Sequence, residues 1–326
     1  ARNVLGLDPA FRTGTKWVLV NHTGRFVKHG VIYPVPPKNQ VEEARKELNA
    51  VLKEHKVDIV AIGNGTASRE VFRFIRDWIK DENHELETLV VNESGASVYS
   101  ASKTAREEFP DLDLTVRGAV SIARRYQDPL AELVKIEPKS IGVGQYQHDV
   151  NQNRLKQSLE RTVESCVNYV GVDLNRASFQ LLEHVSGISP GLARNIVQHR
   201  NLNGAYSTRN DLLNVKGMGK RTFEQSAGFL RVMESENPLD QSAVHPENYT
   251  LVEQMAEHLE LPLKEMVGNE EKLKLIDVKR YEEQGIGSFT LKDIIDELHK
   301  PGRDPRKDHE TVQFDDSVGE ISDLEK

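Results

Sequence analysis

The sequence is poor in cysteine and contains no long apolar run. One cysteine, Cys166, occurs among 326 residues, so no disulfide can form within the chain, and this usage fits a reducing compartment. No apolar stretch reaches the roughly 20 residues that span a bilayer, and no signal-peptide pattern opens the chain. These absences exclude a disulfide-rich secreted fold and predict a cytoplasmic protein with no membrane partner.

Metal-binding patterns are also missing. No Cys-x-x-Cys pair occurs, and four histidines lack the spacing of metal ligands, so we assign no zinc. Cys166 lies in an apolar helical pattern beside Val163 and Val167, which predicts a buried core thiol rather than a nucleophile. The four histidines are His148, His184, His199 and His245.

Acidic residues predominate overall, but they are unevenly distributed. The net charge of −8 argues by itself against a nucleic-acid partner. Residues 181–232 nevertheless hold seven Lys/Arg against three Asp/Glu, whereas residues 233–326 hold eleven against twenty-four. Because local patches rather than totals govern affinity for phosphate, the basic stretch is a candidate nucleic-acid interface.

Two related stretches lie inside this basic region, about thirty residues apart. We call His184–Val197 the first copy and Leu212–Ser226 the second copy. In each, a short apolar helix pattern leads into a glycine-containing turn, and a second helix follows with basic residues in or near its first turns. Each copy resembles the helix-hairpin-helix motif, and the pair resembles the arrangement that grips a duplex without reading its sequence. The alternative interpretation is two ordinary helical hairpins with glycine C-caps.

The second copy has the stronger anion-binding pattern. Gly217 and Gly219 permit backbone angles closed to other residues and close approach of another backbone. Lys220 and Arg221 stand where the free N–H groups of the next helix begin, and Lys216 precedes the turn. These residues predict a site for the phosphate of a nucleic-acid backbone.

The first copy is expected to hold phosphate less strongly. Its turn contains Gly187, Ser189 and Gly191, and Arg194 follows one turn later, but no adjacent Lys/Arg pair is present. Tyr206, between the copies, is expected to pack between the hairpins, with stacking on a base as the alternative.

The first 150 residues have the pattern of an α/β domain. Three apolar strand patterns come first, and then a helix, a strand, a helix, a strand and more helix follow. The second and third strands are joined by Asn21–Gly24, a hairpin-type turn. Ser68 or Thr66 is the expected cap of the helix after the fourth strand. This mixed order is the one found in ribonuclease-H-like folds. The expected strands are 3–8, 16–20, 26–33, 57–62 and 88–91, and the first helix is 41–55.

A series of separate motifs runs through the chain in one order. They are Gly6–Pro9, Phe11–Gly14, Ile62–Glu70, Asn92–Ser100, Arg117–Arg125, Asp128–Val134 and Lys139–Asp149, with Asn237–Asp240, Ala243–Pro246 and Lys300–Asp304 further on. The motifs up to residue 149 resemble the YqgF-type domain of the Tex family, and the later ones extend the resemblance over almost the whole chain.

The resemblance implies a transcription accessory factor that binds nucleic acid, with the transcription machinery as a further partner. It implies a ribonuclease-H-like (YqgF-type) domain over 1–150, a connector helix and tandem helix-hairpin-helix domain over 151–235, a helical extension over 236–300 and a linker over 301–326. Two family parts are missing, an N-terminal helical region and an OB-fold RNA-binding domain. Since the chain also begins without Met, we expect an excised piece.

The segments after residue 150 have helical patterns. Apolar residues at i, i+4 spacing predict one long amphipathic helix from Asn151 to Val170. The tail is expected to be helical at 248–259, 261–267, 270–276 and 289–298, with an edge strand at 311–314 inside the linker.

Nucleases of the ribonuclease-H-like fold use two Mg²⁺ or Mn²⁺ ions held by clustered carboxylates. Asp8, at the end of the first strand, and Glu93, after the fifth, match two of the positions that the resemblance implies. Asn64 replaces a carboxylate at the fourth strand, and Arg117–Arg125 contains no acidic residue. We therefore expect no catalytic residues and no cofactor. One weakly held Mg²⁺ at Asp8 and Glu93 stays an alternative, as does a structural role for the pair.

Three arginines of the last helix in this domain are candidate phosphate contacts. Arg117, Arg124 and Arg125 follow one another on a helical pattern, and a solvated helix face explains them equally well. With the hairpin copies, they predict sequence-independent binding of DNA or RNA through the phosphate backbone. The alternatives are a metal-dependent, structure-specific nuclease that uses Asp8 and Glu93, and a protein-interaction scaffold whose acidic tail docks a basic partner.

Overall fold

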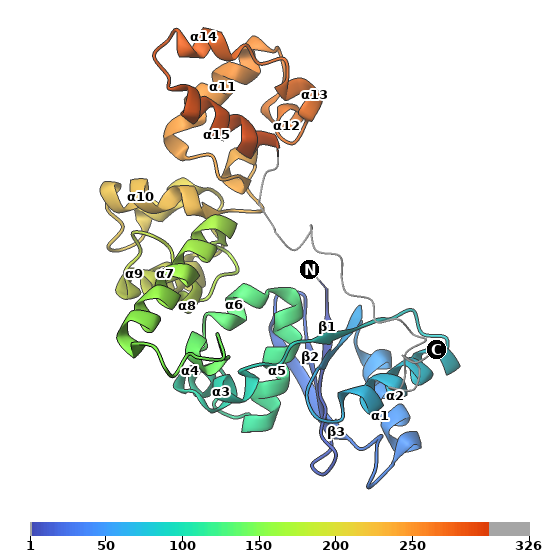
Figure 1. The fold of residues 1–326 in the computed structure, drawn as a ribbon. Helices are drawn as coiled ribbons and strands as arrows, with labels where there is room; N and C mark the ends of the chain where they lie inside the picture. Colours follow the sequence, from blue (N-terminus) through green and yellow to red (C-terminus); the bar gives the residue numbers. More distant parts are fainter. Residues whose placement is uncertain (1, 300–326) are drawn as a thin grey trace, which may run out of the picture. The chain divides into compact units, whose positions relative to one another are not determined.

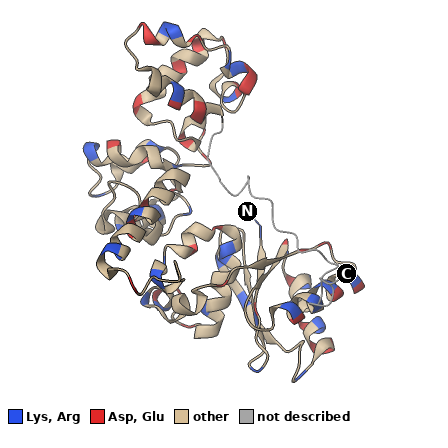
Figure 2. Cartoon of the chain, viewed as in Figure 1, with Lys and Arg blue, Asp and Glu red and all other residues tan. Residues whose placement is uncertain are grey.

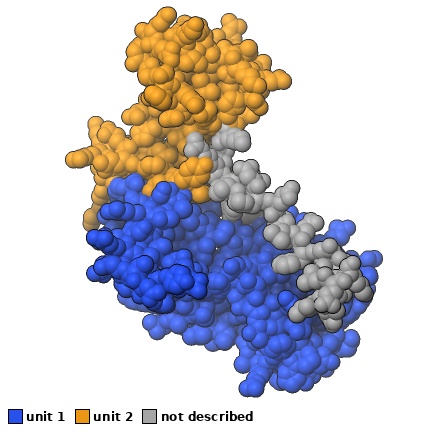
Figure 3. Space-filling model, viewed as in Figure 1, with its two compact units in different colours: residues 1–167, 175–204 blue, residues 168–174, 205–326 orange. Residues whose placement is uncertain are grey.

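The computed structural model describes residues 2–299. The chain divides into two compact units (Figure 3): residues 1–167 with 175–204, and residues 168–174 with 205–326. This division differs from the domain boundaries expected at 150 and 235, because the first hairpin copy belongs to the first unit and the second copy to the second unit. Within residues 2–299, no helix is long and apolar enough to cross a membrane.

A mixed five-stranded sheet forms the centre of the first unit (Figure 1). The strand order is β3-β2-β1-β4-β5, with antiparallel β1–β2 and β2–β3 pairs and parallel β1–β4 and β4–β5 pairs. The predicted mixed α/β, YqgF-like fold is confirmed. The strands are β1 (Val4–Asp8), β2 (Thr15–Val20), β3 (Phe26–Ile32), β4 (Ile59–Gly63) and β5 (Glu87–Val91).

Helices cover both faces of this sheet, which explains why β1 and β4 are nearly continuous apolar runs. One face packs in a core with α1 and α2, and the other packs against α5. Gly6 in β1 allows the close approach of α5, since a Cβ there would lie 2.6 Å from the Ala123 Cβ. The helices are α1 (Val41–Glu54), α2 (Ser68–Asp81), α3 (Ala96–Ala101), α4 (Lys103–Glu108), α5 (Leu114–Gln127) and α6 (Pro129–Leu133), followed by the 3₁₀ turn η1 (Pro138–Ser140).

Turns at the two ends of the sheet test the local predictions. Asn21 accepts from the Arg25 and Thr23 backbone N–H groups and Gly24 has a φ of 77°, so the predicted hairpin turn is confirmed. The predicted cap of α2 is wrong. Ala67 is the N-cap residue, in the left-handed region with a φ of 65°, and no side chain caps the helix.

The long amphipathic helix is confirmed as α7 (Gln152–Val170). Its apolar stripe ends in the buried Val167, but Cys166 is exposed. The prediction of a buried thiol is therefore wrong. Residue 166 is one position from Val167, about 100° around the helix, so the stripe that holds Val167 in the core leaves its neighbour in solvent.

Short helices make up the hairpin copies, and a two-stranded parallel pair lies in the second unit. The sequence did not predict this pair, because its two strands have only two residues each. The elements are β6 (Val172–Asp173), α8 (Phe179–Leu182), α9 (Pro190–Asn203), η2 (Arg209–Asn214), α10 (Lys220–Ser226), η3 (Ala227–Phe229) and β7 (Leu230–Arg231).

The tail of the second unit is a helical module with its own apolar core. The four predicted helices are confirmed, α14 was not predicted, and the predicted strand at 311–314 lies outside the described residues. The elements are η4 (Pro238–Gln241), η5 (Pro246–Asn248), α11 (Tyr249–His258), α12 (Leu263–Met266), α13 (Glu270–Leu273), α14 (Val278–Glu282) and α15 (Ser288–His299).

Candidate nucleic-acid interface

The two hairpin copies have the same backbone hydrogen bonds at an offset of thirty residues. Three amide-to-carbonyl bonds define the turn and the start of the second helix in each copy, and their lengths agree within 0.1 Å. The copies are therefore the same local structure, built from different side chains. The bonds are Val185 to Leu182, Ile188 to Val185 and Ala193 to Ser189 in the first copy, and Val215 to Leu212, Met218 to Val215 and Phe223 to Gly219 in the second.

Only one glycine in each turn has a left-handed backbone. Gly187 has a φ of 84° and its equivalent Gly217 a φ of 91°. Gly219 has a φ of −92°, which any residue can adopt, so the expected backbone requirement at Gly219 is wrong. No atom lies within 4 Å of an ideal Cβ at Gly191 or Gly219. The space above both positions is open to a ligand.

The second copy presents free amide groups beside exposed cations. Lys220, Arg221 and Thr222 form the first turn of α10, and within residues 2–299 their N–H groups have no acceptor. Gly219, the N-cap residue, contributes no side chain that would occupy them. Lys220 and Arg221 are exposed, as is Lys216 before the turn, and Figure 2 colours the start of α10 blue. This arrangement attracts an anion through both the amide dipoles and the side-chain charge.

The first copy has fewer such donors for a structural reason. Pro190 is the first residue of α9 and has no N–H, and the Leu192 N–H is taken by the Ser189 hydroxyl at 3.3 Å. The Gly191 N–H is the remaining donor of this turn. The expected weaker site thus has a backbone cause as well as the missing Lys/Arg pair.

Arg194 of the first copy is folded back on its own hairpin. Its guanidinium lies 3.6 Å from the Glu183 carboxylate and 5.0 Å from the centre of the Phe179 ring. The side chain remains exposed, at 61%. A phosphate contact by Arg194 therefore competes with an ion pair that already exists.

The basic region is less basic at its surface than its sequence indicates. Of its seven Lys/Arg, Arg209 is 0% exposed and Arg231 is 5% exposed, so neither reaches a ligand. Arg200 is half-buried and donates to the Ala177 carbonyl at 3.0 Å. The cations that remain exposed are Arg194, Lys216, Lys220 and Arg221.

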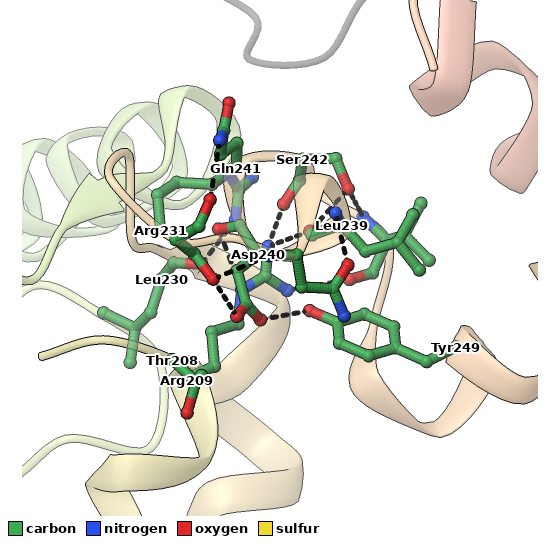
Figure 4. Close-up of polar contacts among 12 residues, drawn as sticks. Thr208, Arg209, Leu230, Arg231, Leu239, Asp240, Gln241, Ser242 and Tyr249 are labelled. Carbon is green, nitrogen blue, oxygen red and sulfur yellow. Dashed lines mark hydrogen bonds and ion pairs between the residues drawn. The ribbon is translucent and has the colours of Figure 1, made fainter. Parts of the chain in front are cut away.

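Arg209 instead joins the second copy to the acidic helical module (Figure 4). It donates to four backbone carbonyls of the segment that begins this module, and its Nε lies 3.9 Å from the Asp240 carboxylate. Asp240 is held in turn by the hydroxyls of Tyr249 at 2.7 Å and Ser235 at 2.8 Å. Burial lowers the pKa of Arg209, while Tyr249 and Asp240 act in the opposite direction. The four carbonyls belong to Leu239, Asp240, Ser242 and Val244.

Tyr206, the aromatic residue between the copies, is only 3% exposed. A base cannot stack on a ring that lies inside the protein, so the structure removes Tyr206 from the candidate stacking residues.

The three arginines of α5 are engaged within the α/β domain. Arg125 is 5% exposed and donates to the Asn92 and Ser94 carbonyls. Arg124 donates to the Gly24 carbonyl and lies 2.9 Å from Glu108, and Arg117 donates to the Phe109 carbonyl. These three side chains therefore form neither a solvated helix face nor a group of cations available to a ligand. We leave all three out of the interface.

Asp8 and Glu93 come close to each other at the carboxyl end of β1. Burial, then repulsion from Glu93, raise the pKa of Asp8 from 3.8 to about 6, while Lys16 lowers it. The Glu93 carboxylate lies over Gly63 and Gly65, where an added Cβ would meet its oxygens at 2.4 and 1.8 Å. No group of three His, Cys, Asp or Glu side chains suitable for a metal occurs in the described part of the chain.

Two further residues, Lys16 and Gly118, lie close to Asp8 of this carboxylate pair. Lys16 is the cross-strand partner of Asp8 and is 7% exposed. Its ammonium group donates to the Thr13 and Gly14 carbonyls, and its positive charge lowers the pKa of Asp8. Gly118 of α5 faces Asp8, since a Cβ there would lie 3.4 Å from the Asp8 Oδ2. At this position α5 therefore presents no side chain to Asp8. The strand pattern contains a signal for Lys16, because β1 and β2 pair across a short connection that places it opposite Asp8.

Sequence reasoning also missed a third glycine turn, Gly285-Ile286-Gly287, before α15. Gly285 has a φ of 87°, and the Leu291 N–H donates to the Gly287 carbonyl as Phe223 does to Gly219. The Gly-x-Gly spacing was the available signal. Glu282 and Glu283 precede this turn, in contrast to Lys216, and acidic residues are numerous on the surrounding module in Figure 2.

Comparison with known proteins agrees with this architecture. The Tex protein YqgF-like domain matches residues 2–127, the helix-hairpin-helix motif matches residues 167–231, and a further helix-hairpin-helix (HHH) domain matches residues 237–306. The class is thus a YqgF-like domain followed by helix-hairpin-helix domains.

Relatives over nearly the whole chain define the family. "Protein tex" of Bordetella pertussis is 51% identical over 324 residues, which are 99% of this chain and 41% of that protein. "Transcriptional accessory protein Tex" of Neisseria gonorrhoeae is 50% identical over 322 residues, 98% of this chain and 42% of that protein. The human "S1 RNA-binding domain-containing protein 1" is 35% identical over 385 residues, 99% of this chain and 38% of that protein. The chain belongs to the Tex family, and it spans about two fifths of the length of these relatives.

Proposed function

We propose that this chain binds nucleic acid without sequence preference, through the phosphate backbone, as part of a Tex-type transcription accessory protein. The observation that carries the proposal is the first turn of α10 in the second copy. Three amide groups there have no acceptor within residues 2–299, and Lys220 and Arg221 are exposed beside them. Amide groups and simple cations recognise phosphate rather than base edges, so the binding discriminates little between sequences.

The first copy provides the second, weaker contact. Its turn has the same backbone geometry, with one free amide at Gly191 and the partly neutralised Arg194. Lys216 adds a cation before the turn of the second copy. The exposed cations of the second copy thus number three, so the logarithm of its duplex affinity should fall with the logarithm of salt with a slope of about −3.

The proposed role of the YqgF-like domain is structural rather than catalytic. Two-metal hydrolysis needs several carboxylate oxygens around each pair of ions. In this domain, Lys16 supplies positive charge that acts on Asp8, the neighbour of Glu93, and α5 places Gly118 against Asp8. A cation entering this site would meet a positive charge and only two carboxylates.

The decisive experiment is a fluorescence-anisotropy titration of labelled duplexes at several salt concentrations, with Lys220→Glu/Arg221→Glu as the variant. We expect weaker binding to every duplex sequence and a salt slope smaller in magnitude by about 2. Lys264→Glu/Lys279→Glu, which changes two exposed lysines of the acidic module by the same total charge, is the matched control. Equal losses in both variants would indicate a nonspecific charge effect, and no loss in the hairpin variant would overturn the proposed site.

The same samples test the catalytic alternative. Incubated with Mg²⁺ or Mn²⁺ and run on a denaturing gel, the labelled strands should stay intact. If the original chain shortens the strands and an Asp8→Asn variant leaves them intact, the carboxylate pair supports hydrolysis.

A further inference from the structure

An exposed loop between the α/β domain and α7 has features that the hairpins do not explain. Within residues 142–150, three large apolar side chains stand in solvent: Val143 is 43% exposed, Tyr146 68% and Val150 49%. Single exposed apolar residues are common on protein surfaces, but three within eight positions of one loop are a local concentration of apolar side chains.

Side-chain amides hold this loop in one conformation. The Gln147 Oε1 accepts from the Val143 N–H at 2.9 Å, and its Nε2 donates to the Lys139 carbonyl at 3.3 Å. Gln152, in the first turn of α7, donates to the Gln147 and Val150 carbonyls, both at 2.9 Å. Tyr146 belongs to two consecutive turns. The Gln147 N–H donates to the Gly144 carbonyl, and the Asp149 N–H donates to the Tyr146 carbonyl. An aromatic ring displayed by a loop that is already ordered loses little entropy on binding.

The backbone around Tyr146 is open, and an exposed arginine follows the loop. No atom lies within 4 Å of an ideal Cβ at Gly142 or Gly144, so another backbone can approach both glycines. Lys139 and Lys156, on either side of the loop, are paired with Glu137 at 3.6 Å and Glu160 at 3.8 Å. Arg154 is exposed in the first turn of α7, two residues after Gln152, whose side chain donates to the loop carbonyls.

We propose that the loop 142–150 is a contact site for single-stranded nucleic acid, with Tyr146 stacking on an unpaired base. A flat exposed ring, open glycines and the exposed Arg154 are the features that favour binding of single strands without reading sequence. Bases inside a duplex are already stacked on one another, so Tyr146 contributes to single strands and not to duplex binding. This site is separate from the hairpin copies, and it rests on the proposed function only in taking nucleic acid as the partner.

The test compares Tyr146→Ala and Tyr146→Trp in the full chain by anisotropy, with single-stranded and duplex probes of about 16 nucleotides. Tyr146→Ala should weaken single-strand binding about 5- to 150-fold and leave duplex binding unchanged, while Tyr146→Trp keeps the single-strand affinity. Phe289→Ala removes an aromatic side chain that is 85% exposed in the acidic module, and it is the matched control. A direct readout is photo-crosslinking to a 5-iodouracil strand, where we expect the adduct on Tyr146.

The outcomes separate this inference from the proposed function. Unchanged single-strand affinity in Tyr146→Ala, with weaker duplex binding in Lys220→Glu/Arg221→Glu, overturns the loop site and leaves the hairpin site standing. If Tyr146→Ala weakens single-strand binding while Lys220→Glu/Arg221→Glu changes no binding, the loop site is supported and the hairpin site is overturned. If no probe binds at low salt, both proposals fail, and the apolar loop is then a surface for a protein partner.

Discussion

Replacing Arg209 by Met should destabilise the second unit and leave the first unit unchanged. The guanidinium is fully buried and donates to four carbonyls of the segment from Leu239 to Val244, which connects the second hairpin copy to the acidic module. Met fills much of the same volume but donates no hydrogen bond. The Leu239 carbonyl keeps the Ser242 donors and the Asp240 carbonyl keeps the Val232 N–H. The substitution therefore leaves the Ser242 and Val244 carbonyls without their donor, and the Asp240 carboxylate loses its nearest cation.

The magnitude follows from these lost partners. A buried polar group without a partner costs about 1–3 kcal/mol, and burying the apolar Met side chain returns about 2 kcal/mol. Removing one member of a buried ion pair typically costs about 3–5 kcal/mol, and we expect Arg209→Met to fall in that range. Tyr249 and Ser235 still donate to Asp240, which keeps the loss from exceeding it.

The chain contains an internal control for the measurement. Its two tryptophans, Trp17 and Trp78, both lie in the core of the first unit, so tryptophan fluorescence in urea reports on that unit alone. Far-ultraviolet circular dichroism follows the helices of both units. For Arg209→Met, we expect dichroism to show a separate transition of the second unit, with its midpoint about 1–3 M urea lower than in the original chain. The fluorescence transition of the first unit should be unchanged. Arg280→Met, at an exposed arginine of α14, should change neither curve.

The result that would refute this reasoning is a dichroism curve for Arg209→Met that coincides with that of the original chain. It would mean that water or the local backbone satisfies the Ser242 and Val244 carbonyls at almost no cost. A fluorescence transition displaced equally with the dichroism would instead show that the two units unfold together.

Two further predictions concern single positions. Because the folded-state pKa of Asp8, about 6, lies above its ordinary value of 3.8, the folded chain binds this proton more tightly, and stability is lost as the pH rises between those values. Asp8→Asn should therefore raise the free energy of unfolding of the first unit by about 2–3 kcal/mol at pH 7 and hardly at all at pH 4, measured by tryptophan fluorescence in urea; a loss at pH 7 would contradict this. Gly217→Ala places Ala at a φ of 91° and should cost about 1–2 kcal/mol and weaken duplex binding, whereas Gly219→Ala, at a φ of −92°, should keep its stability in the same dichroism assay. Equal stability losses at both glycines would show that the backbone angle does not set the requirement.

The sequence by itself determined the elements and their order. Apolar runs and turn residues located all five strands of the sheet, and the order of strands and helices predicted the mixed fold. The Gly-x-x and Gly-x-Gly turns located both hairpin copies, because a left-handed position such as Gly217 has few alternatives to glycine. Such local signals depend on residues that are neighbours along the chain, which a sequence displays directly.

Only the tertiary structure decided which charged groups are available. Lys220 and Arg209 look alike as basic residues of one region, yet Lys220 is exposed at the start of α10. Arg209 is enclosed by carbonyls that lie thirty or more residues away in the chain. Arg125, a candidate contact from its helix pattern, is buried for the same kind of reason. The cost of burying a charge depends on partners from distant segments, and no pattern within one helix records them.

The carboxylate pair and Cys166 show the same division. The sequence placed Asp8 and Glu93 at strand ends, but the shifted pKa of Asp8 arises from burial and from the side chains that the sheet brings around it. Cys166 fitted an apolar helical pattern, and a rotation of one residue decided that Val167 is buried and the thiol is not. Periodicity fixes that a helix has an apolar face, whereas the packing of that face determines which borderline positions solvent reaches.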